Sequence, residues 1–183
     1  FYRAFPLNVC FIRGTTADEK GNLTLEHEPA FLEVLPMAMA TRNSGGIVIA
    51  QVKRLARAGT LHPKMVKVPH TLVDHIVVHP GQWQSVEREY DPALSGEIRV
   101  PISSLPPMEL DERKVIARRA ALEIVALPRA VLNMGVGMPD GIARVAAEEG
   151  IEGRMTATIE QGITGGIPAP GVIFGMSSNP EAI

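Results

Sequence analysis

Cysteine is almost absent from this sequence of 183 residues, which contains Cys10 alone. A single cysteine excludes a disulfide bond within the chain, so the fold is not cross-linked as many small secreted domains are. Cys10 lies in the apolar run Val9-Cys-Phe-Ile12, and nothing near it in the sequence suggests a base that would activate a thiol. We therefore interpret Cys10 as a packed core residue, and a reducing, cytoplasmic setting is the default expectation.

An excess of charge and long apolar runs are also missing. The formal net charge is -2 and the isoelectric point is near 6.2, which excludes a broad basic surface for nucleic acid. No run reaches the roughly 18 apolar residues of a membrane-spanning helix, so no such segment is expected. With 45% hydrophobic residues, the chain can still bury the core of one ordinary domain or of two small pieces.

What the first 80 residues do contain is an alternation of apolar strand-like runs with a helix-like segment. The predicted strands cover residues 8–13, 47–52, 65–68 and 75–78. Residues 28–41 are rich in Ala, Leu and Met and predict a helix, with Pro29 in its first turn and a kink or split at Pro36. The near-continuous apolar run at 47–52 is typical of a strand covered on both faces. The alternation predicts an α/β architecture with mostly parallel pairing.

The composition changes over residues 81–110. Five prolines fall between Pro80 and Pro107 inclusive, among polar stretches. This composition favours an extended linker over a packed element. The predicted organisation is therefore an α/β unit at 1–80, an interdomain linker at 81–110, and a second α/β unit at 111–183.

The second unit predicts the order helix, strand, glycine turn, helix and strand. Asp111 is expected to cap a helix that runs to about Leu127. Its packed face is predicted to consist of Ile116, Ala120, Ile124 and Leu127. A strand at 131–134 precedes a helix that starts near Pro139, ends near Gly150 and packs through Ile142, Val145 and Ala146. The last predicted strand covers residues 155–159.

Glu160 stands directly after that last strand. Thr156, Thr158 and Ile159 have the β-branched character of a strand, and the glycines at 162, 165 and 166 make it unlikely to continue. Open α/β sheets hold their ligands at the carboxyl ends of the strands. The pattern therefore marks Glu160 as a candidate site residue, although a surface glutamate that merely ends a strand is the alternative for any isolated Glu-x-Gly.

A family resemblance is found in four stretches of the sequence. They are the run Thr158-Ile-Glu-Gln-Gly-Ile-Thr-Gly-Gly-Ile-Pro168 and residues 11–23, 43–52 and 133–141. The first resembles the nucleophile segment of family I coenzyme A transferases, with the closest likeness to the propionate (acetate) branch. The others resemble a turn segment, a core strand and the glycine loop that opens the family's second domain, in the family's order. The resemblance implies parts of two open, mostly parallel α/β domains, and identifies the chain as a middle fragment of a longer enzyme.

The resemblance also implies a reaction, in which coenzyme A moves between a short-chain acyl-CoA and a free carboxylic acid. Glu160 is then the nucleophile and forms a covalent glutamyl-CoA thioester, with no permanently bound cofactor and no metal. The glycines expected to contact substrate or CoA, or to form an oxyanion loop, are Gly135, Gly137, Gly162, Gly165 and Gly166. The expected partners are the remaining segments of the enzyme and, as a homo-oligomer, further copies of it. The isolated fragment is expected to be inactive, because groups outside it contribute to the site.

Two other functions stay open: an acyl-CoA hydrolase, with water as the final acceptor, and a non-catalytic α/β binding module. The run Gly135-Val-Gly-Met-Pro-Asp-Gly141 invites a dinucleotide-binding interpretation, but its spacing is G-x-G-x-x-x-G, and Asp140 adds negative charge where a pyrophosphate would lie. The same run could bind an acyl carboxylate at the helix N-terminus, or could be only a tight turn.

No metal site is predicted from the histidines. His75 and His79 share one face of a predicted strand, but they are about 13 Å apart at ~3.3 Å per residue. One ion cannot readily bind both at a distance of about 2.1 Å each. The basic pairs at 53–54 and 118–119 are either solvated ends of elements or contacts to CoA phosphates, and the sequence does not decide between these.

Overall fold

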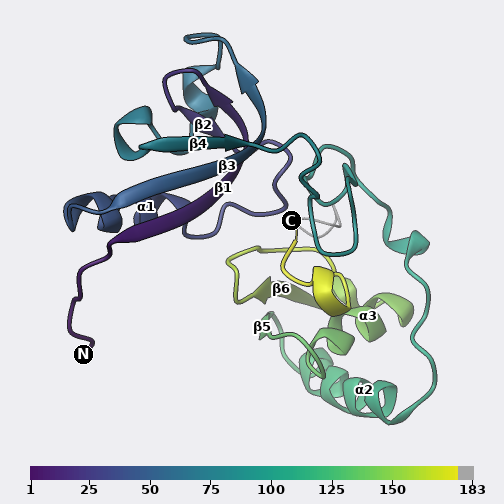
Figure 1. The fold of residues 1–183 in the computed structure, drawn as a ribbon. Helices are drawn as coiled ribbons and strands as arrows, with labels where there is room; N and C mark the ends of the chain where they lie inside the picture. Colours follow the sequence, from purple (N-terminus) through teal and green to yellow (C-terminus); the bar gives the residue numbers. More distant parts are fainter. Residues whose placement is uncertain (177–183) are drawn as a thin grey trace. The chain divides into compact units, whose positions relative to one another are not determined.

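The computed structural model describes residues 1–176, and the chain divides into two compact units, Phe1–Tyr90 and Asp91–Ile183 (Figure 1). The division falls inside the segment 81–110 that the proline content predicts as a linker. Between residues 79 and 110 the regular structure is a single 3-10 turn, Ile102–Ser104. Gln82, Gln84 and Leu94 in this segment are buried, so its backbone is irregular but packed and is not the extended linker that was predicted. No helix among residues 1–176 combines the length and the apolar character needed to cross a membrane.

A four-stranded sheet forms the centre of the first unit. Its strands are β1 (Val9–Asp18), β2 (Leu23–Thr24), β3 (Ile47–Ala56) and β4 (His75–Val78), in the order β2-β1-β3-β4. The pairs β1–β3 and β3–β4 are parallel, and β2 is antiparallel at the edge. The predicted α/β class with mostly parallel pairing is confirmed.

Helix α1 (Val34–Asn43) covers one face of this sheet, where the buried core gathers (Figure 1). Cys10 is part of that core, as predicted. Alternate residues of β3 differ sharply in exposure: Val48 is fully buried, whereas Ile47 is 44% exposed. The prediction that residues 47–52 are covered on both faces is therefore wrong for this chain, because within the described residues only the face toward α1 is fully buried.

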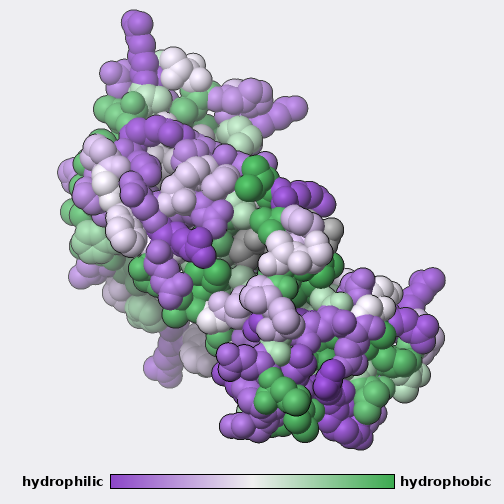
Figure 2. Space-filling model, turned by 90° about the vertical axis from the view of Figure 1, so that its right-hand side faces the viewer, coloured by the Kyte–Doolittle hydropathy of each residue, from purple (hydrophilic) through white to green (hydrophobic). Residues whose placement is uncertain are grey.

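On the side of the molecule in Figure 2, hydrophilic and hydrophobic residues are interspersed.

The start of α1 was predicted six residues too early. The helix begins at Val34, which places Pro36 in the first turn instead of the interior. Proline is tolerated there because backbone N–H groups of the first turn have no partner inside the helix. The kink expected at Pro36 is therefore unnecessary, and Pro29 lies outside the helix.

The strand predicted at 65–68 is also wrong. Residues Pro63–Met65 form a 3-10 helix, which begins where His62 Nδ1 accepts a hydrogen bond from the Lys64 amide. Of the predicted strand, Val68 alone pairs, through an isolated bridge to Leu23. Proline at the first helical position pre-sets the turn and overrides the β-branched character of the residues that follow.

The second unit contains helix α2 (Glu112–Val125), strand β5 (Ala130–Met134), helix α3 (Asp140–Glu148) and strand β6 (Met155–Ile159). This is the predicted order, and β6 has the predicted bounds. Strands β5 and β6 pair in parallel. As predicted, the Asp111 side chain caps α2, accepting a hydrogen bond from the Lys114 amide at 2.9 Å.

The packed face of α2 differs from the prediction. Its buried residues are Lys114, Ala117, Ala121 and Ile124, whereas Ile116 is 47% and Leu127 51% exposed. Ala117 and Ala121 form one buried cluster with Val145 of α3. Small side chains allow the two helices to approach, and this contact outweighs the burial of the larger Ile116. On α3, Val145 and Ala146 are buried as predicted.

Candidate active site

Glu160 follows the last residue of β6, and its side chain is exposed. The parallel register pairs Met134, at the end of β5, with Ile159, at the end of β6. The next residues along the two strands, Gly135 and Glu160, therefore leave the sheet at the same carboxyl edge. A Cβ atom placed on Gly135 would lie 3.0 Å from Glu160 Oε2. The structure thus brings together two candidate residues that are 25 positions apart.

The loop after Glu160 folds back along β6. The Ile159 amide donates to the Ile163 carbonyl at 3.1 Å, and Thr158 and Thr164 form an antiparallel bridge. Gly162, Gly165 and Gly166 have φ values of 90°, 90° and 63°, which residues other than glycine rarely adopt. These three predicted site glycines are thus required by the reversal of the chain beside Glu160.

Three of the candidate glycines already use their amides within the protein. The Gly162 amide donates to the Ile159 carbonyl at 2.9 Å, and the Gly165 amide donates to the Ala157 carbonyl at 2.7 Å. The Gly137 amide donates to Asp140 Oδ2 at 3.3 Å. An oxyanion role for these amides stays a prediction, and it would require the amides to exchange partners.

Asp140 shapes the start of α3. It is buried, and its carboxylate accepts a hydrogen bond from the Gly137 amide of the glycine loop. This carboxylate lies at the helix N-terminus, where an anionic ligand would approach. This arrangement supports the interpretation of residues 135–141 as a tight strand-to-helix turn and argues against a pyrophosphate there.

Gln161 contacts a part of the chain that Glu160 does not. A Cβ atom on Gly175 would lie 2.5 Å from the Gln161 side-chain amide carbon, so Gln161 packs over that glycine. The carboxylate of Glu160 instead meets Gly135. Neighbouring side chains at the end of a strand face opposite ways, which leaves Glu160 as the side chain at the β5–β6 edge.

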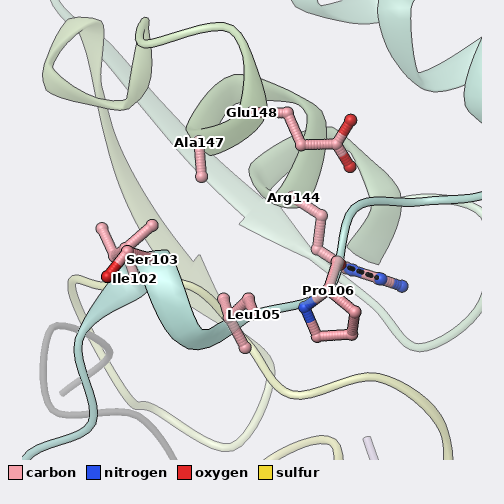
Figure 3. Close-up of a pocket in the computed structure, with 7 residues that line it drawn as sticks. All are labelled: Ile102, Ser103, Leu105, Pro106, Arg144, Ala147 and Glu148. Carbon is pink, nitrogen blue, oxygen red and sulfur yellow. Dashed lines mark hydrogen bonds between the residues drawn. The ribbon is translucent and has the colours of Figure 1, made fainter.

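Two cavities of the second unit lie near these elements. One of about 200 Å³ is lined by β6 and the glycine loop, including Met155, Thr156, Gly165 and Gly166. The other, of about 140 Å³, lies between Ile102–Pro106 and α3 (Figure 3). There Arg144 donates to the Pro106 carbonyl at 3.0 Å. Both are smaller than the ~300 Å³ or more of a typical small-molecule pocket, so neither encloses a molecule as large as coenzyme A.

A polar network in the first unit was not predicted. Glu28 Oε2 lies 2.8 Å from Arg13 Nε, and Glu28 Oε1 accepts a hydrogen bond from Gln82 at 2.9 Å. Gln82 also donates to the Gly14 carbonyl. Burial raises the pKa of the Glu28 carboxyl even though the Arg13 guanidinium lies beside it. No local pattern could reveal this network, because its members are separated by up to 69 positions.

Metal-binding clusters are not found in residues 1–176: no three His, Cys, Asp or Glu side chains there are grouped so that they could hold an ion. The histidines instead join local structure. His27 stacks on Tyr90 with ring centroids 4.6 Å apart, and the His70 amide donates to Asn22 Oδ1.

The comparisons with known proteins agree that this chain is similar to coenzyme A transferases. A family model described as coenzyme A transferase matches residues 2–79. The chain is 47% identical over 185 residues to the caffeate CoA-transferase of Acetobacterium woodii, and the match covers 100% of the chain and 35% of that protein. It is 41% identical to the acetate CoA-transferase of Escherichia coli (strain K12), covering 100% of the chain and 34% of that protein.

The fold is shared as well. A crystal structure of an acyl-CoA transferase from Escherichia coli O157:H7, a thioester complex with CoA, matches with a TM-score of 0.82 and 40% identity. That match covers 92% of this chain and 31% of the other. The chain thus spans about a third of the length of the relatives it matches.

Proposed function

Because this chain belongs to family I of the coenzyme A transferases, we propose that the protein containing it transfers coenzyme A between an acyl-CoA and a free carboxylic acid, with Glu160 as the covalent nucleophile. The observation that carries this proposal is the position of Glu160. Its exposed carboxylate stands at the carboxyl end of β6, next to Gly135 at the end of β5. A nucleophile on a strand end is held by a rigid element and remains open to a large thioester.

The reaction needs no metal or ATP, because a thioester is already activated. A carboxylate oxygen of Glu160 attacks the acyl carbon, the C–S bond breaks, and CoA leaves as the thiolate. The thiolate then attacks the glutamyl carbonyl of the mixed anhydride and expels the first acid as its carboxylate. A second carboxylate reverses both steps, so the number of acyl, thioester and carboxylate groups is conserved.

For the acyl group we propose a short chain of the acetate or propionate kind. The relative named for acetate supports this choice. The relative at 47% identity is named for caffeate, which is an aromatic acid, so caffeoyl-CoA is the informative competitor. A preference for caffeoyl-CoA over acetyl-CoA in kcat/KM would contradict the short-chain part of the proposal and leave the Glu160 part intact.

Covalent loading of Glu160 tests the mechanism directly. The complete natural polypeptide containing these residues is incubated with acetyl-CoA and no acceptor acid, and its peptides are analysed by mass spectrometry. We expect a glutamyl thioester on the peptide containing Glu160, reducible by borohydride and trapped by hydroxylamine. Glu160→Gln should remove this label and reduce exchange by about 10⁴-fold or more, because an amide is a poor nucleophile.

The control is Glu109→Gln, which changes an exposed glutamate of the same unit. It should retain both loading and exchange. A label at another residue, or exchange at the wild-type rate in Glu160→Gln, would overturn the assignment. Release of CoA at full rate without any acceptor acid would indicate a hydrolase instead.

A further inference from the structure

We infer that Gly135 is a positioning residue for the nucleophile: its missing side chain is the space in which the Glu160 carboxylate lies. The inference rests on the proposed function and adds to it a second residue, from a different strand. It gives Gly135 a role other than binding coenzyme A or donating to an oxyanion.

The backbone does not explain a glycine at this position. Gly137, two residues later, has a φ of 108° and needs glycine for its conformation. Gly135 is not in the left-handed region, so other residues could adopt its φ. What distinguishes Gly135 is its surroundings.

Glu160 is the neighbour that a side chain at position 135 would meet. Among the described residues, Glu160 Oε2 is the one heavy atom beyond the adjacent residues within 4 Å of an added Cβ, at 3.0 Å. That separation is shorter than ordinary van der Waals contact between a carbon and an oxygen. The carboxylate is the end of an exposed, flexible side chain, so it can move aside without any change in the backbone. A larger residue at 135 therefore displaces the nucleophile and leaves the fold intact.

Displacement of a nucleophile by about 1 Å can slow its reaction by on the order of 10²-fold. The single Cβ of Gly135→Ala requires the carboxylate to move by only a few tenths of an ångström, so we expect a smaller reduction in the first-order rate of Glu160 loading. The branched side chain of Gly135→Val should displace the carboxylate further and reduce the rate by about that factor. The melting temperature and the dissociation constant of CoA should stay at their wild-type values. This combination separates positioning from a structural role, which would lower the melting temperature, and from a CoA-binding role, which would weaken binding.

Gly153 provides the matched control. Like Gly135 it lies in the second unit outside the left-handed region, but apart from its neighbours along the chain no described atom lies within 4 Å of an added Cβ. Gly153→Ala therefore makes the same chemical change with no neighbour to displace, and should load Glu160 at the wild-type rate.

The measurement is single-turnover loading of the complete polypeptide by acetyl-CoA, followed by rapid quenching and mass spectrometry of the Glu160 peptide. Wild-type loading together with an unchanged rate in both Gly135→Ala and Gly135→Val overturns the inference and leaves the proposed function standing. A slower rate that comes with a lower melting temperature or weaker CoA binding also overturns it. Absence of loading in the wild-type protein overturns the proposed function itself.

Discussion

Two glutamates that are close in the sequence of the first unit show how surroundings set the behaviour of a residue. Glu26 is partly buried, which by itself raises its pKa, but hydrogen bonds from Thr16, Thr24 and Arg54 lower the pKa to about 2. For Glu28, burial prevails over Arg13 and raises the pKa. The carboxylate form is thus favoured at one position and disfavoured at the other.

Linkage converts these shifts into opposite dependences of stability on pH. The stability that Glu26 contributes is present above its ordinary pKa of 4.5 and is lost as the pH falls toward 2. The protonated form of Glu28 stabilises the fold, so its contribution is lost as the pH rises through the raised pKa. We expect Glu26→Gln to flatten the fall in the free energy of unfolding between about pH 4.5 and 2.

Urea denaturation at several pH values measures the effect of Glu26→Gln on the free energy of unfolding. Trp83, the single tryptophan, serves as a fluorescent probe within the first unit. Glu28→Gln serves as the paired variant. It should remove the decrease in the free energy of unfolding that occurs as the pH rises above 4.5. It should leave the pH dependence of that free energy below pH 4.5 unchanged. Parallel profiles for the two variants would contradict the opposite pKa shifts.

At the scale of the element, helix α2 shows that contact with a partner selects the buried face. A Cβ atom on Gly141 of α3 would lie 3.3 Å from Ala117 Cβ, so the two helices are in close contact there. Lys114 joins this face because its ammonium group reaches the Met108 carbonyl at 2.9 Å and Glu148 at 2.5 Å. A long cationic side chain can be buried in this way when its charged end is paired.

Substitutions at adjacent positions test this face. Ala117→Leu should reduce the free energy of unfolding of the second unit by about 1–3 kcal/mol, because no space exists for the added atoms. Ile116→Ala should change it by only about 0.5 kcal/mol, because that side chain is half exposed. Urea denaturation followed by circular dichroism at helical wavelengths measures both. A larger decrease in the free energy of unfolding for Ile116→Ala than for Ala117→Leu would contradict the observed face and support the one predicted from the sequence.

At the scale of the whole molecule, the chain holds two units with separate cores. The core of the first unit is centred on β1 and β3, and those of the second on β5, β6 and the two helices. Units with their own cores can lose structure separately.

We therefore expect Val48→Ala, a truncation at a fully buried position of the first unit, to lower the stability of that unit by on the order of 2 kcal/mol. The midpoint of the Trp83 fluorescence transition should fall, while hydrogen exchange protection of residues 130–159 stays unchanged. Equal loss of protection in both units would show that they unfold as one.

The sequence by itself determined the features that depend on neighbours in the chain. The bounds of β6 followed from β-branched residues and the glycines after them, and the cap of α2 followed from Asp111. The α/β class and the position of Glu160 at a strand end were predicted in the same way, whereas the family was predicted from the resemblance of residues 158–168 and three other stretches. Such signals are local, because strand propensity, capping and left-handed glycines act over a few residues.

Tertiary structure alone decided which distant residues meet. Parallel pairing of β5 with β6 placed Gly135 against Glu160, and Gln82 reached Glu28 across 54 positions. The wrong face predicted for α2 has the same origin. Burial depends on the shape of the partner surface, and that surface is assembled from segments whose separation along the chain carries no signal of their contact.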